Sequence, residues 1–149
     1  MSINKIFYQI SGYSSSVISN DDLNNYYIPV SKELFERLCQ VTINLSSQTE
    51  TIEDGIGNSL GSVTTYTTGD DVHDTIIAEI AASRADQRYD KVRIDPLTGE
   101  RVNKHWDIAM DLMLKYYGVW VDRQLVLPIW LQNKTSTSFN GIKKVSSEY

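Results

Sequence analysis

The segment from residue 102 to residue 117 carries more apolar surface than one neighbouring helix can cover. On a helical wheel at about 100° per residue its large apolar side chains span roughly 240°, whereas an ordinary surface helix needs only about 100°. One face contains Val102, Trp106, Ala109, Met110, Met113, Leu114 and Tyr117, and Ile108, Leu112 and Tyr116 extend it round the far side. Such a helix must be covered on two sides. The second cover is either another subunit or the N-terminal helix and terminal hairpin of the same chain.

The same segment contains His105, Asp107 and Asp111, residue types that serve in metal and acid–base sites. His105 and Asp107 lie about 200° apart on the wheel, so they cannot share a ligand or a proton. A helical zinc pair needs a second histidine four positions after the first, and that residue is alanine. Asp107 and Asp111 share a stripe with Lys104 and Lys115, which indicates a solvated face of mixed charge. We expect no catalytic residue, no metal site and no cofactor.

Composition narrows the classes of function. The 149 residues predict one compact domain with a tail, and 41% hydrophobic residues suffice for a small core. The net charge of -5 argues against a dedicated nucleic-acid surface. The single cysteine, Cys39, permits neither an intrachain disulfide nor a cysteine zinc site, and we expect it to be a buried small hydrophobe. Without an apolar run of about 20 residues or a signal peptide, the protein is expected to be soluble, in a reducing cytoplasm, without membrane contact.

The N-terminal third is predicted to contain little regular structure before its first long helix. Residues 3–10 are β-branched and aromatic, which favours a strand or an arm, and a Ser- and Gly-rich loop follows. The acids at 21 and 22 are predicted to cap a helical turn over residues 23–27. Ser31 after Pro29 is the predicted N-cap of a helix from Lys32 to about Thr49 or Glu53, with Leu34, Leu38, Val41 and Leu45 on its apolar stripe.

Residues 53–71 contain glycines at 55, 57 and 61, which invites comparison with a phosphate-binding loop. That motif needs a preceding strand, a following helix and, in a P-loop, a lysine. Here the approach, residues 49–54, is acidic and predicted to be helical, and no such lysine follows. We therefore expect residues 54–70 to be a mobile connector, with pairing of residues 62–68 as a strand as the alternative.

The C-terminal half carries the strongest periodicity. Residues 71–90 open with capping acids and place Ile76, Ile77, Ile80, Ala81 and Ala85 on one face. Alanines at 78, 81, 82 and 85 allow a second helix to approach closely, and Arg84 and Arg88 are expected to bury their stems. A turn over 93–101 leads to the helix from about Glu100 to Tyr117, which Gly118 ends.

After Gly118 the pattern changes to β. Residues 119–131 predict a hairpin with its turn at 122–124, and Pro128 places the second run at an edge. Residues 133–149 have no periodicity and are expected to be mobile in the free chain. This tail nevertheless contains spaced apolar residues and a lysine pair that are candidates for docking on a partner: Phe139, Ile142, Lys143, Lys144 and Val145.

The predicted fold is therefore mainly α: a small helical bundle with a short β-hairpin and extended N- and C-terminal arms. Its parts are an N-terminal arm or strand with its loop (1–30), a helical core domain (31–132) and the tail (133–149). The candidate packing or interface residues are Trp106, Met110, Met113, Tyr117 and Trp120.

Two helices and a short β segment in this order resemble the helical core of head–tail connector proteins of tailed bacteriophages, also called adaptor or neck-ring proteins. The segments are DTIIAEIAASRADQRYD, RVNKHWDIAMDLMLKYYG and VWVDRQLVL. In that family the second helix often begins with a basic segment, followed by an aromatic, an acid and a short apolar motif; Trp106, Asp107, Ala109 and Met110 stand at those positions. The resemblance covers about residues 71–127.

The resemblance implies a structural virion protein that is located in the neck or tail region and in the host cytoplasm during assembly. Its partners would be copies of itself in a ring, typically twelvefold, the portal protein and other neck or tail proteins. DNA would pass through the lumen without specific binding, which the acidic charge favours. The alternatives are a tail-completion or tail-terminator ring subunit, or a small cytoplasmic regulatory module; an enzyme is disfavoured because no nucleophile–base or metal set is present.

Overall fold

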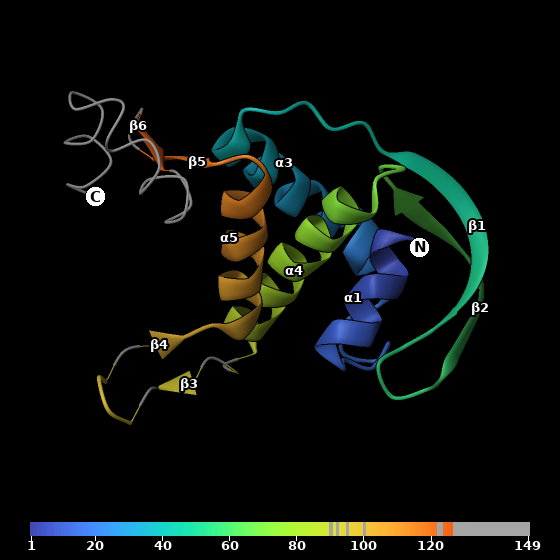
Figure 1. Cartoon of the computed structure of the whole chain (residues 1–149). Coiled ribbons are helices and arrows are strands. Elements are labelled where there is room, and N and C mark those ends of the chain that lie inside the picture. The colour runs from blue at the N-terminus through green and yellow to red at the C-terminus, as the bar shows by residue number, and fades with distance from the viewer. Residues whose placement is uncertain (90, 92, 95, 100, 122–123, 127–149) are drawn as a thin grey trace.

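A computed structural model describes residues 1–89, 91, 93–94, 96–99, 101–121 and 124–126 (Figure 1). Three helices, α1, α3 and α5, pack around a fourth, α4, and an antiparallel hairpin lies along α1. The described strands form three two-stranded sheets. The fold is therefore a helical core with antiparallel hairpins, in agreement with the coarse prediction of a helix-plus-hairpin protein.

The chain begins with a helix, so the prediction of a strand or an arm at residues 3–10 is wrong. Helix α1 spans Ile3–Ser11, the side chain of Ser2 accepts a hydrogen bond from the Lys5 N–H, and Gly12 ends the helix with φ 71°. Ile3 and Phe7, one turn apart, are fully buried. This spacing together with the two caps outweighs the β propensity of the individual residues.

A second helical region runs without a break from residue 20 to residue 39 and includes Pro29. Helix α2 (Asn20–Asp22) continues through a π-helical turn (η1, Leu23–Tyr27) into α3 (Ile28–Cys39), with proline in the first turn of α3. The predicted helical turn at 23–27 is confirmed, although the cap is Ser19. The prediction that Ser31 starts the helix is wrong, because proline is tolerated in a first helical turn and the backbone runs through it. Ser31 lies inside the helix and is buried.

The predicted extension of this helix to residue 49 or 53 is also wrong. Gln40 adopts φ 55° and ends α3 just after Cys39. The chain then forms β1 (Ser46–Glu53), which pairs with β2 (Ser59–Thr67) in antiparallel register with Thr49 opposite Thr64. Most of the segment predicted as a connector is thus a turn and a strand, and the alternative of strand pairing over 62–68 is confirmed as far as Thr67. Runs of Ser and Thr favour a strand over a helix because β-branched and hydroxyl side chains lower helix propensity.

Helix α4 spans Asp71–Arg88 and is the centre of the core. Asp70 caps it by accepting hydrogen bonds from the Val72 and His73 N–H groups, so the predicted capping acids are confirmed. The helix is buried all round its middle, and Ala78, Ala81, Ala82 and Ala85 are fully buried. Small side chains on several faces let α1, α3 and α5 approach one axis, and this confirms the predicted close approach.

The remaining elements follow the predicted order. Strands β3 (Arg93–Ile94) and β4 (Arg101–Val102) lie at the two ends of the region predicted as a turn, 93–101. Helix α5 spans Lys104–Tyr116 with Asn103 as its N-cap, so the predicted start at about Glu100 is wrong and Val102 belongs to β4. Gly118 follows with φ 77°, and β5 (Val119–Val121) pairs with β6 (Gln124–Val126) as predicted. The central turn residues of that hairpin, Pro128 and the tail from 133 lie outside the described residues.

Two further predictions concern single residues. Cys39 is buried, and burial raises the pKa of its thiol to about 12, so it is the small apolar residue that the sequence predicts. Arg88 lies at the end of α4, where its guanidinium donates to the Tyr27 hydroxyl at 3.3 Å. Its side chain is exposed, so the prediction of a buried stem is wrong for Arg88. In the described part of the chain, no helix is long and apolar enough to cross a membrane.

Candidate interaction face and the pocket beside it

Helix α5 turns one side to α4, and the apolar side chains that flank this side have intermediate burial. Ala109 and Met113 are fully buried against the core, whereas Trp106 and Met110 are only partly buried. The opposite stripe carries the four predicted charges, Lys104, Asp107, Asp111 and Lys115, and all four are exposed, which confirms the predicted solvated face. The described part of the chain therefore covers the arc in part, and a second subunit as its further cover stays a prediction.

Large apolar residues are exposed at both ends of α5. Val102, just before the helix, is 38% exposed, Tyr116 in its last turn is 49% exposed and Trp120 in β5 is 40% exposed. Together with Trp106 and Met110 these residues define the α5 face. Of the predicted packing or interface residues, Met113 belongs to the core, Trp120 is exposed, and Trp106, Met110 and Tyr117 have intermediate burial. The predicted tail-docking residues (Phe139, Ile142, Lys143, Lys144 and Val145) lie outside the described residues.

Tyr117 has a packing role inside the chain. Its hydroxyl forms a hydrogen bond with Nε2 of His73 at the start of α4, and its ring meets the Phe35 ring edge-on with centroids 5.7 Å apart. Burial raises the pKa of the Tyr117 phenol above its usual value. These contacts tie the end of α5 to α3 and α4, and they hold the neighbouring Tyr116 on the outer side.

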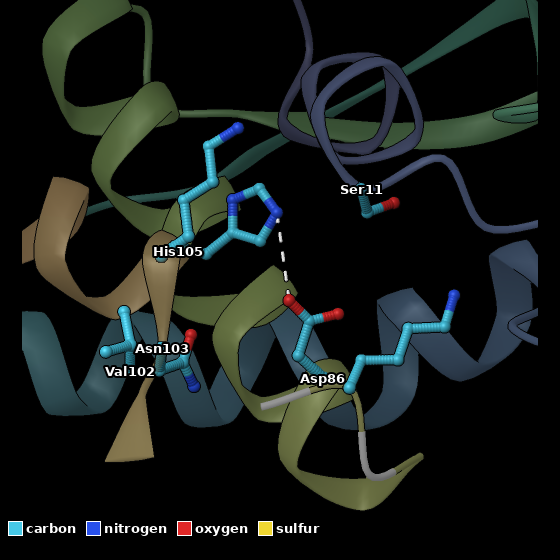
Figure 2. Close-up of a pocket in the computed structure, with 7 residues that line it drawn as sticks. Ser11, Asp86, Val102, Asn103 and His105 are labelled. Carbon is cyan, nitrogen blue, oxygen red and sulfur yellow. Dashed lines mark ion pairs between the residues drawn. The ribbon is translucent and has the colours of Figure 1, made fainter. Parts of the chain in front are cut away.

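A pocket of about 570 Å³ lies at the other end of α5 (Figure 2). Its lining comes from the end of α1, the end of α4 and the first turn of α5. The residues are Ser11, Asp86, Lys91, Val102, Asn103, Lys104 and His105. The lining therefore combines one carboxylate, two lysines and a histidine with neutral polar groups.

His105 connects two carboxylates of α4. Its Nδ1 atom lies 2.7 Å from Oε2 of Glu79, and its Nε2 atom lies 3.8 Å from Oδ2 of Asp86 (Figure 2 draws the second pair). Glu79 and His105 are 4% and 8% exposed. The other oxygen of Asp86 accepts a hydrogen bond of 2.8 Å from the Tyr13 hydroxyl. Burial and, as the next largest cause, this hydrogen bond raise the pKa of Tyr13. The network joins α4, α5 and the loop after α1.

Sequence reasoning missed this network because it compared His105 only with acids on its own helix. Glu79 and Asp86 lie on α4, far along the chain. One signal was present: Glu79 interrupts an otherwise apolar run, residues 76–82, where a buried acid needs a partner. Chemically, the arrangement resembles a structural hydrogen-bond network rather than a metal centre. Among the described residues no group of three or more His, Cys, Asp and Glu side chains is placed to hold a metal ion.

Comparison of the chain with protein-family models, with curated proteins and with solved structures found no match. The interpretation of function therefore depends on the residues and their geometry.

Proposed function

We propose that the protein is a structural subunit of a head–tail connector ring, located in the virion neck, and that it is not an enzyme. The observation that supports this most directly is the α5 face, where Val102, Tyr116 and Trp120 are exposed and Trp106 and Met110 are only partly buried. Aromatic residues and methionine at a surface are typical of a protein–protein contact. In a ring, the α5 face of one copy packs against a different surface of the next.

The proposal also assigns roles to the rest of the chain. Copies assemble beneath a portal protein, in the typical case as twelve subunits, and contact further neck or tail proteins. The acidic charge of -5 per copy disfavours adhesion of DNA to the lumen. The C-terminal segment, residues 133–149, serves as an extended arm that docks on a neighbour or on the portal.

The test is assembly with a matched pair of variants. Full-length chain is produced together with the portal and neck proteins encoded in the same genome, and the complexes are imaged by cryo-electron microscopy. Tyr116→Ser removes a 49% exposed ring from the α5 face, and Tyr26→Ser removes a 46% exposed ring from η1. The wild type and Tyr26→Ser should form rings on the portal, whereas Tyr116→Ser should lose most of them.

The images also separate the rival functions. A ring at the distal end of a tail would identify a tail-terminator subunit, and a ring at the lower end of an already assembled neck would identify a tail-completion subunit. Absence of the protein from every particle, with a discrete dimer in solution, would favour the cytoplasmic regulatory module and would contradict the proposal.

A further inference from the structure

The two edges of the β1–β2 hairpin differ in how their backbone groups are satisfied. The Thr64 carbonyl, at the outer edge of β2, accepts hydrogen bonds from the side-chain amides of Asn20 and Asn24 at 2.8 and 2.9 Å. The Tyr66 N–H on the same edge donates to Oδ1 of Asn4 at 3.0 Å. Three asparagines therefore bond to two backbone groups at the edge of β2.

The register shows which groups of β1 face outward. In an antiparallel pair, residues opposite each other either both point their N–H and C=O groups toward the partner strand or both point them away. Thr49 is opposite Thr64 and Ser47 is opposite Tyr66, so both point away from β2, as does Thr51 opposite Ser62. Within the described residues, the backbone groups of these three β1 residues have no hydrogen-bond partner outside the hairpin.

The free edge of β1 lacks most of the protection that isolated edges usually have. It contains no proline and no lysine, its residues 46–49 are exposed, and a bulge appears only at Ile52/Glu53. Beside its far end lies a groove of about 310 Å³ between Thr51–Asp54 and the α1 residues Lys5 and Gln9. One end of this edge is thus exposed, and a groove lies beside the other end.

We propose that β1 is the docking site for β1 of a second copy, in an antiparallel pair centred on Thr49. In this register Thr49 faces its own copy and Ser47 faces Thr51 of the other chain. The three outward residues then exchange about six backbone hydrogen bonds, two in each directly bonded pair. The two hairpins become one four-stranded sheet.

The side chains of β1 favour this register. On the exposed face every cross-strand pair is hydroxyl against hydroxyl, a combination that stabilises antiparallel sheets. On the other face, Glu50 is opposite Gln48 of the second copy, so no two carboxylates are directly opposite. A shift of the register by two residues that sets Thr49 opposite Thr51 would place Glu50 against Glu50, and like charges in that position are destabilising. The pairs that two copies of β1 form in this register are thus hydroxyl with hydroxyl and carboxylate with amide, and this match of β1 with itself favours a second copy as the occupant.

This contact is independent of the ring proposed above. Figure 1 shows the hairpin on the side of the molecule away from α5. A contact with twofold symmetry is complete once two copies have joined, and it leaves the α5 face of each copy free. If both surfaces are used, two rings join through their hairpins.

The first test is cross-linking of the full-length chain. Opposed residues in a directly bonded antiparallel pair have Cα atoms about 5.5 Å apart, a separation that a disulfide can span. Thr49→Cys should form a covalent dimer under mild oxidation, whereas Thr64→Cys, equally exposed on β2, should not. The wild type controls for Cys39, which is buried. Equal cross-linking of both variants, or none at Thr49→Cys, would overturn the proposal.

The second test removes the backbone donor. Proline is tolerated on an edge strand where the N–H points outward, so Thr49→Pro should keep the monomer fold. Its dimer dissociation constant in sedimentation equilibrium should rise at least tenfold, whereas Thr49→Val should leave it within about twofold.

Amide hydrogen exchange of the wild type completes the design and does not depend on how any variant folds. The amides of Ser47, Thr49 and Thr51 should become protected as the protein concentration rises. Protection that is independent of concentration would mean that another segment of the same chain occupies the edge, and no protection at any concentration would mean that nothing does. Either result would refute the second copy as the occupant.

Discussion

The Nδ1 atom of His105 lies 2.7 Å from Oε2 of Glu79, and both side chains are buried between α4 and α5. His105→Ala would leave the Glu79 carboxylate buried without this partner, and we expect a loss of about 1–3 kcal/mol in the free energy of unfolding. Lys104→Ala, at the exposed preceding residue, should change it by less than about 0.5 kcal/mol. Urea unfolding measures both, and equal effects would show that the contact contributes nothing.

Substitutions at Met113 and Trp106 should distinguish a residue that stabilises the free chain from a residue that is needed for ring assembly. Met113 is fully buried, so Met113→Ala should cost about 2–5 kcal/mol. A fully buried tryptophan would cost about 3–5 kcal/mol. Trp106 is only partly buried in the free chain, so Trp106→Ala should lower the free energy of unfolding by less than a fully buried tryptophan would. The same substitution should impair ring formation more than it impairs stability. Thermal melting and imaging of portal complexes measure the two effects; unchanged stability and unchanged assembly would contradict the role of Trp106 as an anchor.

Gly55 should tolerate no side chain. A Cβ atom there would clash with the backbone of Gly12. The N–H of Gly55 donates to the Tyr13 carbonyl at 2.8 Å, which holds the two backbone segments together. Gly55→Ala should therefore separate the hairpin turn from the end of α1 and lower the melting temperature by several degrees. Ile56→Ala, at a 65% exposed neighbour, is the control and should melt like the wild type. A wild-type melting temperature for Gly55→Ala would contradict the close approach.

Asp54 should make the free energy of unfolding depend on pH in the acidic range. Burial alone would raise the pKa of this carboxyl, but the N–H groups of Ser15, Asn58 and Ile56 donate to it and hold its pKa at about 2, below its usual 3.8. Its contribution is fully present above the usual pKa and is lost as pH falls through about 2. Asp54→Asn should be less stable than the wild type at pH 7, and the difference should shrink toward pH 2. Urea midpoints measured from pH 7 to pH 2 test this, and a constant difference would exclude it.

Deletion of residues 133–149 tests the predicted role of the tail. These residues contain little apolar surface to offset an ordering cost of about 1–2 kcal/mol per residue. The truncated protein should therefore keep the melting temperature of the full chain while portal docking fails. Replacement of Lys143 and Lys144 by glutamine in the full chain is a milder variant that should weaken docking only in part. Normal assembly of the truncated protein would exclude the docking role.

The helices with a regular apolar repeat were predictable from the sequence, and those that depend on tertiary packing were not. Periodicity located α4 and α5 because Ile76 and Ile80 in α4, and Ala109 and Met113 in α5, recur at helical spacing. It was overlooked at α1, where Ile3, Ile6, Phe7 and Ile10 have helical spacing but the segment is short and rich in β-branched and aromatic residues. It failed after Cys39, where only the pairing of β1 with β2 makes the extended backbone favourable.

The candidate site was predictable to a similar extent. The apolar arc and the mixed-charge stripe of α5 follow from the wheel, because both depend on one helix alone. The contacts of His105 with Glu79 and Asp86 do not, since they require the relative placement of two helices. The burial of Asn4, which accepts a hydrogen bond from the Tyr66 N–H at the edge of β2, could not be predicted from the sequence either. A polar residue in an amphipathic segment is expected to face water.

The central position of α4 affects how the chain can fold during its synthesis. The apolar residues of α1 are made early, but the helix that they pack against begins only at Asp71. Until that part of the chain has left the ribosome, Ile3 and Phe7 have no native partner on α4. Nascent chains that end before α4 should therefore bind chaperones. The apolar residues of α1 should become protected from chaperone binding only when the chain extends beyond Arg88.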